Sequence, residues 1–118
     1  MAESMGFSVE VEEKEDYPIV HVKGEVDVYT CPELQNKLNQ VIDNGQIQII
    51  LNFKNLQYID STGLGTIAHT AQNIKNKNGQ VHIICNTPQI KKIFRVSGLE
   101  KRNITIYETE TDVLKELA

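Results

Sequence analysis

The stretch YIDSTGLG, which runs from Tyr58 to Gly65, decides how the rest of the chain is organised. An apolar, strand-like run precedes it, and apolar residues at helical spacing follow it. Between the two lie the carboxylate of Asp60, the hydroxyls of Ser61 and Thr62, and two glycines. The stretch therefore predicts small polar groups at the start of a helix. Free backbone N–H groups and the positive end of the helix dipole favour an anion there, so the Ser61 hydroxyl is a candidate phosphate acceptor.

The N-terminal part of the chain reads as a β-hairpin. Apolar and polar residues alternate over 7–12 and again over 17–23, with a polar turn at 14–16 between them. Gly24 is expected to end the second strand. The connector that follows carries two carboxylates, Glu25 and Asp27.

Helix signals then alternate with strand signals. Thr30 is placed to cap a first helix, with Glu33 completing a capping box, and Asn44 and Gly45 close that helix. Further buried strands are expected at 47–53, 81–85 and 104–107, and further helices start near Gly63, Pro88 and Thr109.

The resulting order is ββαβαβαβα. It predicts one α/β domain over residues 1–118, with a core from about 7 to 117, a mixed and mostly parallel sheet, an N-terminal hairpin and about four helices. Functional loops of such a sheet lie at the carboxyl ends of its strands. We therefore expect the loop 25–29 and the loop 60–63 to meet on one side.

Composition narrows the classes of partner. The 118 residues include 12 Lys and Arg against 16 Asp and Glu, for a formal net charge of −4, so neither nucleic acid nor an anionic membrane is expected as the main partner. The two cysteines have no CxxC spacing and imply no disulfide framework.

No apolar run is long enough to span a bilayer, and the first residues do not resemble a signal peptide. A cytoplasmic protein is the expectation.

Motifs of catalysis are missing from the sequence. His21, His69 and His82 have no metal-ligand spacing with one another, and Ser61 lacks the G-x-S-x-G nucleophile elbow. No Walker-type or G-x-G-x-x-G run is present. We therefore expect no catalytic residue, no metal and no cofactor.

Asp60 is a second candidate for phosphorylation, as in receiver domains. That chemistry needs an acidic magnesium-binding cluster and a lysine after a late strand. The acidic residues Glu10, Glu12 and Glu13 are poorly placed for the first role, and residues 85–87 supply no lysine for the second.

A serine switch is the third interpretation. A phosphate would add roughly −1.5 to −2 charges at the helix start, where the fold tolerates it, and would act mainly on whatever binds this surface. The plainer alternative is that Asp60, Ser61 and Thr62 only cap the helix. On the residues alone, capping is favoured.

Three motifs in order resemble bacterial anti-sigma factor antagonists of the STAS domain family. They are DSTGLG at 60–65, GEVDVYTCP at 24–32, and the ending that runs from FRVSGL at 94–99 to ITIY at 104–107. The resemblance covers about residues 7 to 117. It implies that Ser61 is phosphorylated by an anti-sigma factor that is also a serine kinase. The unphosphorylated form binds that partner and frees the sigma factor, the phosphorylated form does not bind, and a serine phosphatase resets the switch.

The same resemblance implies a partner-binding surface around Ser61. Asp27 corresponds to an acidic residue of partner recognition, and Gly63 and Gly65 allow close backbone approach. The residues expected on this surface are Glu25, Asp27, Tyr29, Thr30, Asp60, Thr62, Gly63, Leu64 and Gly65. Some family members are instead scaffold subunits or lipid-transport accessories without sigma control, and that alternative stays open.

Overall fold

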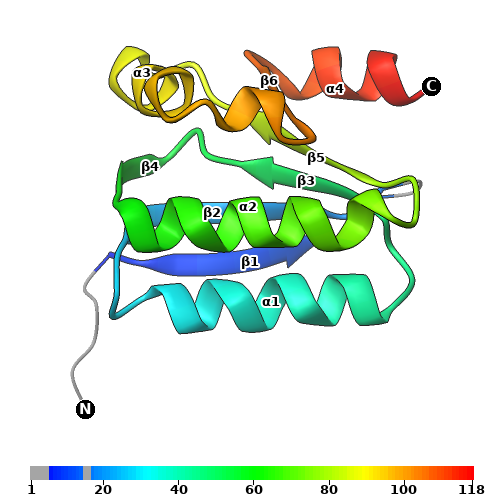
Figure 1. The fold of residues 1–118 in the computed structure, drawn as a ribbon, viewed down its shortest axis with the longest axis horizontal. Coiled ribbons are helices and arrows are strands. Elements are labelled where there is room, and N and C mark those ends of the chain that lie inside the picture. Colours follow the sequence, from blue (N-terminus) through cyan, green and yellow to red (C-terminus); the bar gives the residue numbers. More distant parts are fainter. Residues whose placement is uncertain (1–5, 15–16) are drawn as a thin grey trace.

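The computed structural model describes residues 6–14 and 17–118 (Figure 1). Its strands are β1 (Ser8–Glu12), β2 (Ile19–Val26), β3 (Gln48–Asn52), β4 (Leu56–Ile59), β5 (Gln80–Ile84) and β6 (Ile104–Tyr107). Its α-helices are α1 (Cys31–Asp43), α2 (Ser61–Lys75), α3 (Pro88–Ser97) and α4 (Glu110–Leu117), and a short 3-10 helix, η1 (Leu99–Lys101), follows α3.

The sheet is mixed and mostly parallel, as expected. Its order is β1-β2-β3-β5-β6, with β1 antiparallel to β2 and the remaining neighbours parallel. Val9 pairs with Val22 and Val11 with Val20, which confirms the N-terminal hairpin. Of the polar turn expected at 14–16, Glu15 and Asp16 lie outside the described residues.

The expected element order was wrong in one respect, because the chain contains an additional strand, β4. The order is ββαββαβαβα. After β3 ends at Asn52 the chain turns, and β4 pairs with the end of β2 instead of continuing beside β5. The turn is held by the Leu56 backbone amide, which donates to the carbonyl of Phe53 at 3.0 Å.

Gly24 does not end β2, contrary to the sequence expectation. The strand continues to Val26 through a register shift between Gly24 and Glu25. Gly24 has φ +92°, and a Cβ there would lie 2.7 Å from the carbonyl oxygen of Gly6. A side chain would be strained in that conformation and would meet a neighbouring backbone, so the position favours glycine.

Two groups of buried apolar residues lie on opposite faces of the sheet. Ile49 and Leu51 of β3 join the large core group beneath α1, α2 and α3, whereas Ile50 joins Val113 of α4 in a smaller one. Successive strand residues point to opposite faces, which explains the split. Figure 1 shows α1 and α2 side by side along one face of the sheet. The two helices thereby bring their first turns to the same end of the molecule.

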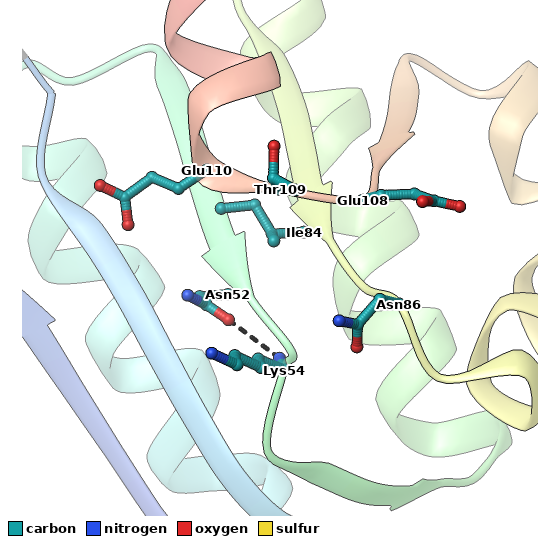
Figure 2. A pocket seen from close by; sticks show the side chains of 7 residues that line it. All are labelled: Asn52, Lys54, Ile84, Asn86, Glu108, Thr109 and Glu110. Carbon is teal, nitrogen blue, oxygen red and sulfur yellow. Dashed lines mark hydrogen bonds between the residues drawn. The ribbon is translucent and has the colours of Figure 1, made fainter.

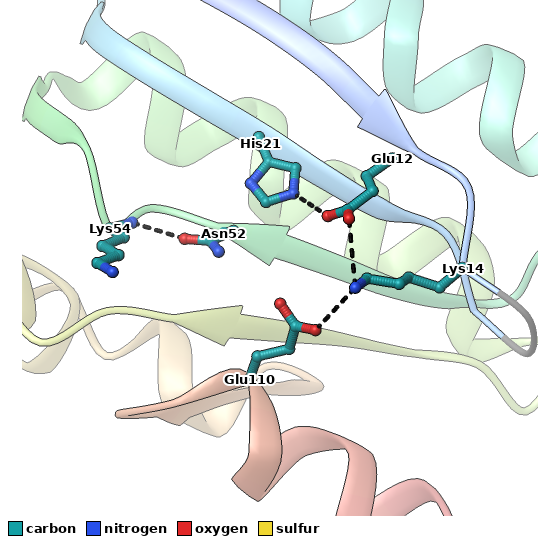
Figure 3. A network of polar contacts seen from close by, with 6 residues as sticks. All are labelled: Glu12, Lys14, His21, Asn52, Lys54 and Glu110. Carbon is teal, nitrogen blue, oxygen red and sulfur yellow. Dashed lines mark hydrogen bonds and ion pairs between the residues drawn. The ribbon is translucent and has the colours of Figure 1, made fainter.

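A polar network connects the hairpin to α4 (Figure 3). Lys14 Nζ lies 3.2 Å from Glu12 Oε2 and 3.5 Å from Glu110 Oε2, and His21 Nε2 lies 2.7 Å from Glu12 Oε1. The hydrogen bond with His21 lowers the pKa of Glu12. These side chains are 33–45% exposed to solvent, so each pair stabilises the fold only slightly.

Candidate functional site

One backbone hydrogen bond joins the two loops that the sequence analysis expects to meet. The Asp60 amide donates to the carbonyl of Val26 at 3.0 Å, at the end of the parallel pairing between β2 and β4. Asp27 and Ser61 each directly follow one of these two residues. The expected adjacency of the loops at 25–29 and 60–63 is therefore confirmed.

Asp60 alone provides the side-chain cap of α2. Its backbone is extended, and its Oδ1 accepts a hydrogen bond from the Gly63 amide at 3.0 Å. Ser61 and Thr62 are exposed, and neither side chain makes a hydrogen bond within the described part of the chain. The Asp60 carboxylate fills the cap of α2, so the Ser61 hydroxyl is not needed there. Ser61 is exposed to solvent at the first helical position.

The two glycines of the motif differ in their surroundings. Gly63 is buried, and a Cβ there would lie 2.6 Å from Val26 Cγ1 and 2.7 Å from Ile59 Cγ1. Gly65 is exposed, and a Cβ there would meet no atom within 4 Å. The close approach at Gly63 is thus made inside the fold, whereas Gly65 faces open space on α2.

The Asp27 carboxylate organises the neighbouring loop. Its Oδ1 accepts from the backbone amides of Tyr29 at 2.9 Å and Thr30 at 3.1 Å. The buried Thr30 hydroxyl donates to the Glu25 carbonyl at 2.8 Å and accepts from the Asp27 amide at 2.9 Å. These four hydrogen bonds hold the loop, which presents Tyr29, 84% exposed, beside Val28.

Thr30 does not form the expected capping box, and that expectation was wrong. It precedes α1 with helical backbone angles and makes no side-chain cap. The Thr30 hydroxyl bonds to the backbone groups of Glu25 and Asp27 instead, so it does not cap an amide of α1.

The first turns of α1 and α2 also touch. Buried Cys31 places its Sγ 2.8 Å from Thr66 Oγ1 and 3.7 Å from the carbonyl of Thr62. The Asp27 loop leads directly into α1, so this contact fixes the loop relative to the start of α2.

An apolar groove borders the start of α2 on the side of α3. It has a volume of about 530 Å³ between α2 and α3 and is lined by Leu64, Gln89, Lys92, Ile93, Val96 and Ser97. Val96 is 76% exposed. Leu64 is predicted at this surface from its sequence motif, whereas the α3 residues that line the groove are not. The available signal was Val96, which lies outside the apolar face formed by Ile90, Ile93 and Phe94.

Comparison with known proteins decides the family. The model of the STAS domain matches residues 8–113. The chain belongs to the STAS domain family. The Staphylococcus aureus protein named anti-sigma-B factor antagonist is 32% identical to it over 96 residues, which are 81% of this chain and 89% of the relative. The Paenibacillus polymyxa anti-sigma F factor antagonist is 32% identical over 114 residues, which are 96% of this chain and 97% of the relative.

Solved structures share the fold of this STAS domain. An anti-sigma factor antagonist from Mycobacterium paratuberculosis superposes with a TM-score of 0.86 at 22% identity, covering 98% of this chain and 97% of its own. The phosphorylated form of SpoIIAA from Bacillus superposes with a TM-score of 0.71 at 22% identity, covering 94% of this chain and 100% of its own. The expected α/β fold and the family resemblance are both confirmed.

Of the residues expected on the partner-binding surface, Glu25 has a side chain that points away from α2. Burial alternates along the end of β2, so that Gly24 and Val26 are buried and Glu25 is exposed. Val26 packs against Gly63, and the Glu25 side chain therefore points away from α2. Its carbonyl still contributes to the site, through the hydrogen bond from Thr30.

The histidines of the STAS domain are dispersed. His21 contacts Glu12, and buried His82 lies 2.8 Å from Gln48 Oε1 and 3.3 Å from the Tyr107 hydroxyl. Burial lowers the pKa of His82. In the described ranges, 6–14 and 17–118, no three His, Cys, Asp or Glu residues gather in a way that could hold a metal ion. None of the helices described is both long and apolar enough to cross a membrane.

Proposed function

We propose that this STAS domain is a cytoplasmic anti-sigma factor antagonist controlled by phosphorylation of Ser61. Unphosphorylated, it binds an anti-sigma factor that is also a serine kinase, and so frees the sigma factor. Phosphorylation of Ser61 ends this binding, and a serine phosphatase restores it. The domain contributes no catalytic group, because the kinase supplies ATP, magnesium and the general base.

The exposed Ser61 hydroxyl carries this proposal. Asp60 fills the cap of α2, so the hydroxyl is available to a kinase without opening the helix. The names of the two curated relatives support the role in sigma factor control.

The surroundings of Ser61 suit a switch that acts by charge. A phosphate adds roughly −1.5 to −2 charges and three strong acceptor oxygens. The carboxylates of Asp60 and Asp27 are already on the two adjoining loops. Added negative charge there repels an acidic partner surface and raises the desolvation cost of the interface, while the N-terminus of α2 tolerates it.

The binding surface has three parts on this proposal. They are the loop from Asp27 to Thr30 with exposed Tyr29, the start of α2 from Asp60 to Gly65, and the apolar groove at Leu64 and Val96. Exposed aromatic residues and apolar pockets are both typical of protein interfaces.

Phosphosite mapping tests the assignment of Ser61. The purified chain is incubated with MgATP and a candidate partner, an anti-sigma factor serine kinase from the same organism, and the products are mapped by mass spectrometry. We expect one phosphate, on Ser61, which Ser61→Ala abolishes and the matched variant Thr62→Ala retains. Stoichiometric phosphorylation of Ser61→Ala would refute the assignment. A hydroxylamine-labile phosphate on Asp60 would indicate receiver chemistry instead.

A further inference from the structure

A second hollow lies where three parallel strands end, beside the start of α4 (Figure 2). Its volume is about 200 Å³, and its lining consists of Asn52, Lys54, Ile84, Asn86, Glu108, Thr109 and Glu110. None of these residues belongs to the surface around Ser61. They lie at or just after the ends of β3, β5 and β6.

The hollow follows from the way the sheet splits. The Phe53 amide still donates to the Ile84 carbonyl at 2.8 Å, but β4 then pairs with β2 only. Beyond Ile84, β5 therefore keeps its neighbour β6 but has no strand on its β3 side, and a crevice opens there. Crevices at the carboxyl ends of parallel strands are the usual ligand sites of α/β sheets.

Both carboxylates of the lining are directed outward. Figure 2 shows Glu108 and Glu110 extending to opposite sides of the hollow. Glu108 Oε1 lies 2.8 Å from Lys91 Nζ, and Glu110 Oε2 lies 3.5 Å from Lys14 Nζ. Each carboxylate is thus compensated by a lysine outside the hollow. Lys54 forms no ion pair with any described residue.

Apart from the two carboxylates, the polar groups that line the hollow are mainly hydrogen-bond donors. Asn52 Oδ1 accepts from the Lys54 backbone amide at 2.9 Å, which leaves the Asn52 NH₂ group without a described partner. Thr109 Oγ1 accepts from the Asp112 amide at 3.1 Å, so its O–H is left to donate. The Lys54 ammonium and the Asn86 amide complete the set, above the apolar floor of Ile84.

We propose that this hollow binds the oxyanion of a small molecule, either a carboxylate or a phosphate. The Lys54 ammonium supplies the charge, and the amides of Asn52 and Asn86 supply directed hydrogen bonds. The inference goes beyond the role in sigma factor control and does not depend on Ser61.

Nuclear magnetic resonance titrations of the full chain test the site, with inorganic phosphate and acetate as separate probes. We expect saturable shifts of the side-chain amides of Asn52 and Asn86 and of the backbone amide of Thr109. The probe that saturates at lower concentration identifies the class of oxyanion. Sodium chloride of equal ionic strength serves as the reference.

Substitution of the exposed Lys54 makes the test specific. Lys54→Gln removes a charge-assisted hydrogen bond and should weaken binding about tenfold or more. Lys77→Gln, in the exposed turn after α2, is the matched control and should leave binding unchanged. The site is refuted if the shifts grow linearly without saturating, if chloride reproduces them, or if Lys54→Gln binds as tightly as the unmodified chain.

Discussion

The Asp60 amide donates to the Val26 carbonyl at 3.0 Å, and this bond joins the start of α2 to the loop that leads into α1. On one side of it, Asp60 caps α2 and exposes Ser61. On the other side, Asp27 gathers the backbone amides of Tyr29 and Thr30. On the proposed function, the partner kinase would meet a surface already held by these hydrogen bonds, which lowers the entropic cost of binding.

The two glycines of the motif should respond in opposite ways to alanine. Gly63→Ala inserts a Cβ against Val26 and Ile59, and overpacking of this kind costs about 1–3 kcal/mol of unfolding free energy. Gly65→Ala enters open space, and the better helix former should stabilise the fold by up to about 1 kcal/mol. Urea denaturation measures both values. Equal stability of the two variants would contradict the packing described for Gly63.

Gly65→Ala also separates stability from binding. If a partner backbone approaches α2 closely at this position, the added methyl group should weaken the complex while the free protein gains stability. Isothermal titration calorimetry with the partner kinase measures the affinity. An affinity unchanged by Gly65→Ala would place the partner's contact elsewhere on the helix.

The stability of the Asp27 loop should depend more on the buried hydroxyl of Thr30 than on the charge of Asp27. Thr30→Val leaves the Glu25 carbonyl and the Asp27 amide without their partner, which should cost about 1–3 kcal/mol. Asp27→Asn keeps an oxygen acceptor and should change stability by less than about 0.5 kcal/mol. Thermal or urea unfolding compares the two variants, and any loss of partner affinity in Asp27→Asn then reports the carboxylate charge. A Thr30→Val protein as stable as the unmodified chain would contradict this view of the loop.

The groove on α3 should matter for binding and not for folding. Val96 is 76% exposed, so Val96→Ser should change stability by less than about 0.5 kcal/mol. As part of the interface it should weaken partner binding by about 1–2 kcal/mol. Leu114→Ser, on the more exposed side of α4, is the matched control. Equal affinities of the two variants would exclude the groove from the interface.

Stability should fall in mild acid because of His82. Burial lowers its pKa and outweighs the opposing attraction of Glu116. The unfolded chain, in which the pKa is about 6.5, then binds a proton that the folded chain does not bind. The contribution of His82 to stability is complete above that pH and is lost as the pH falls toward the lowered value.

His82→Gln should remove this pH dependence. The number of protons taken up on unfolding, obtained from the slope of unfolding free energy against pH, should decrease by up to about one. His69→Gln, on the exposed side of α2, is the control substitution. A slope unaffected by His82→Gln would assign the acid sensitivity to other groups.

The sequence predicts the architecture well where hydrophobic periodicity decides it. Val9 and Val11 alternate with glutamates and form β1, and Ile104 to Tyr107 form β6 as expected. Thr109 caps α4, and Gly98 ends α3 with φ +76°. These features depend on local residue types, so local reasoning identifies them.

Features that depend on tertiary contacts could not be predicted from local residue types. The sequence predicts a strand at 47–53 and only an apolar run at 56–59 that leads into the motif, because pairing with β2, not local residue types, makes 56–59 the separate strand β4. Thr30 has the residue type of a helix cap, but the backbone groups of Glu25 and Asp27 compete for its hydroxyl. The groove needs α2 and α3 in place, and no single helix pattern reveals it.

The phosphorylation switch is tested most directly by one comparison of affinities. The partner kinase is titrated calorimetrically, in the presence of ADP, with the unphosphorylated chain and with the chain carrying phosphate on Ser61. We expect the phosphate to weaken binding about tenfold or more, because it places about two negative charges beside Asp60 and Asp27. Ser61→Ala should bind like the unphosphorylated chain. Equal affinities of the phosphorylated and unphosphorylated chains would contradict the proposed switch.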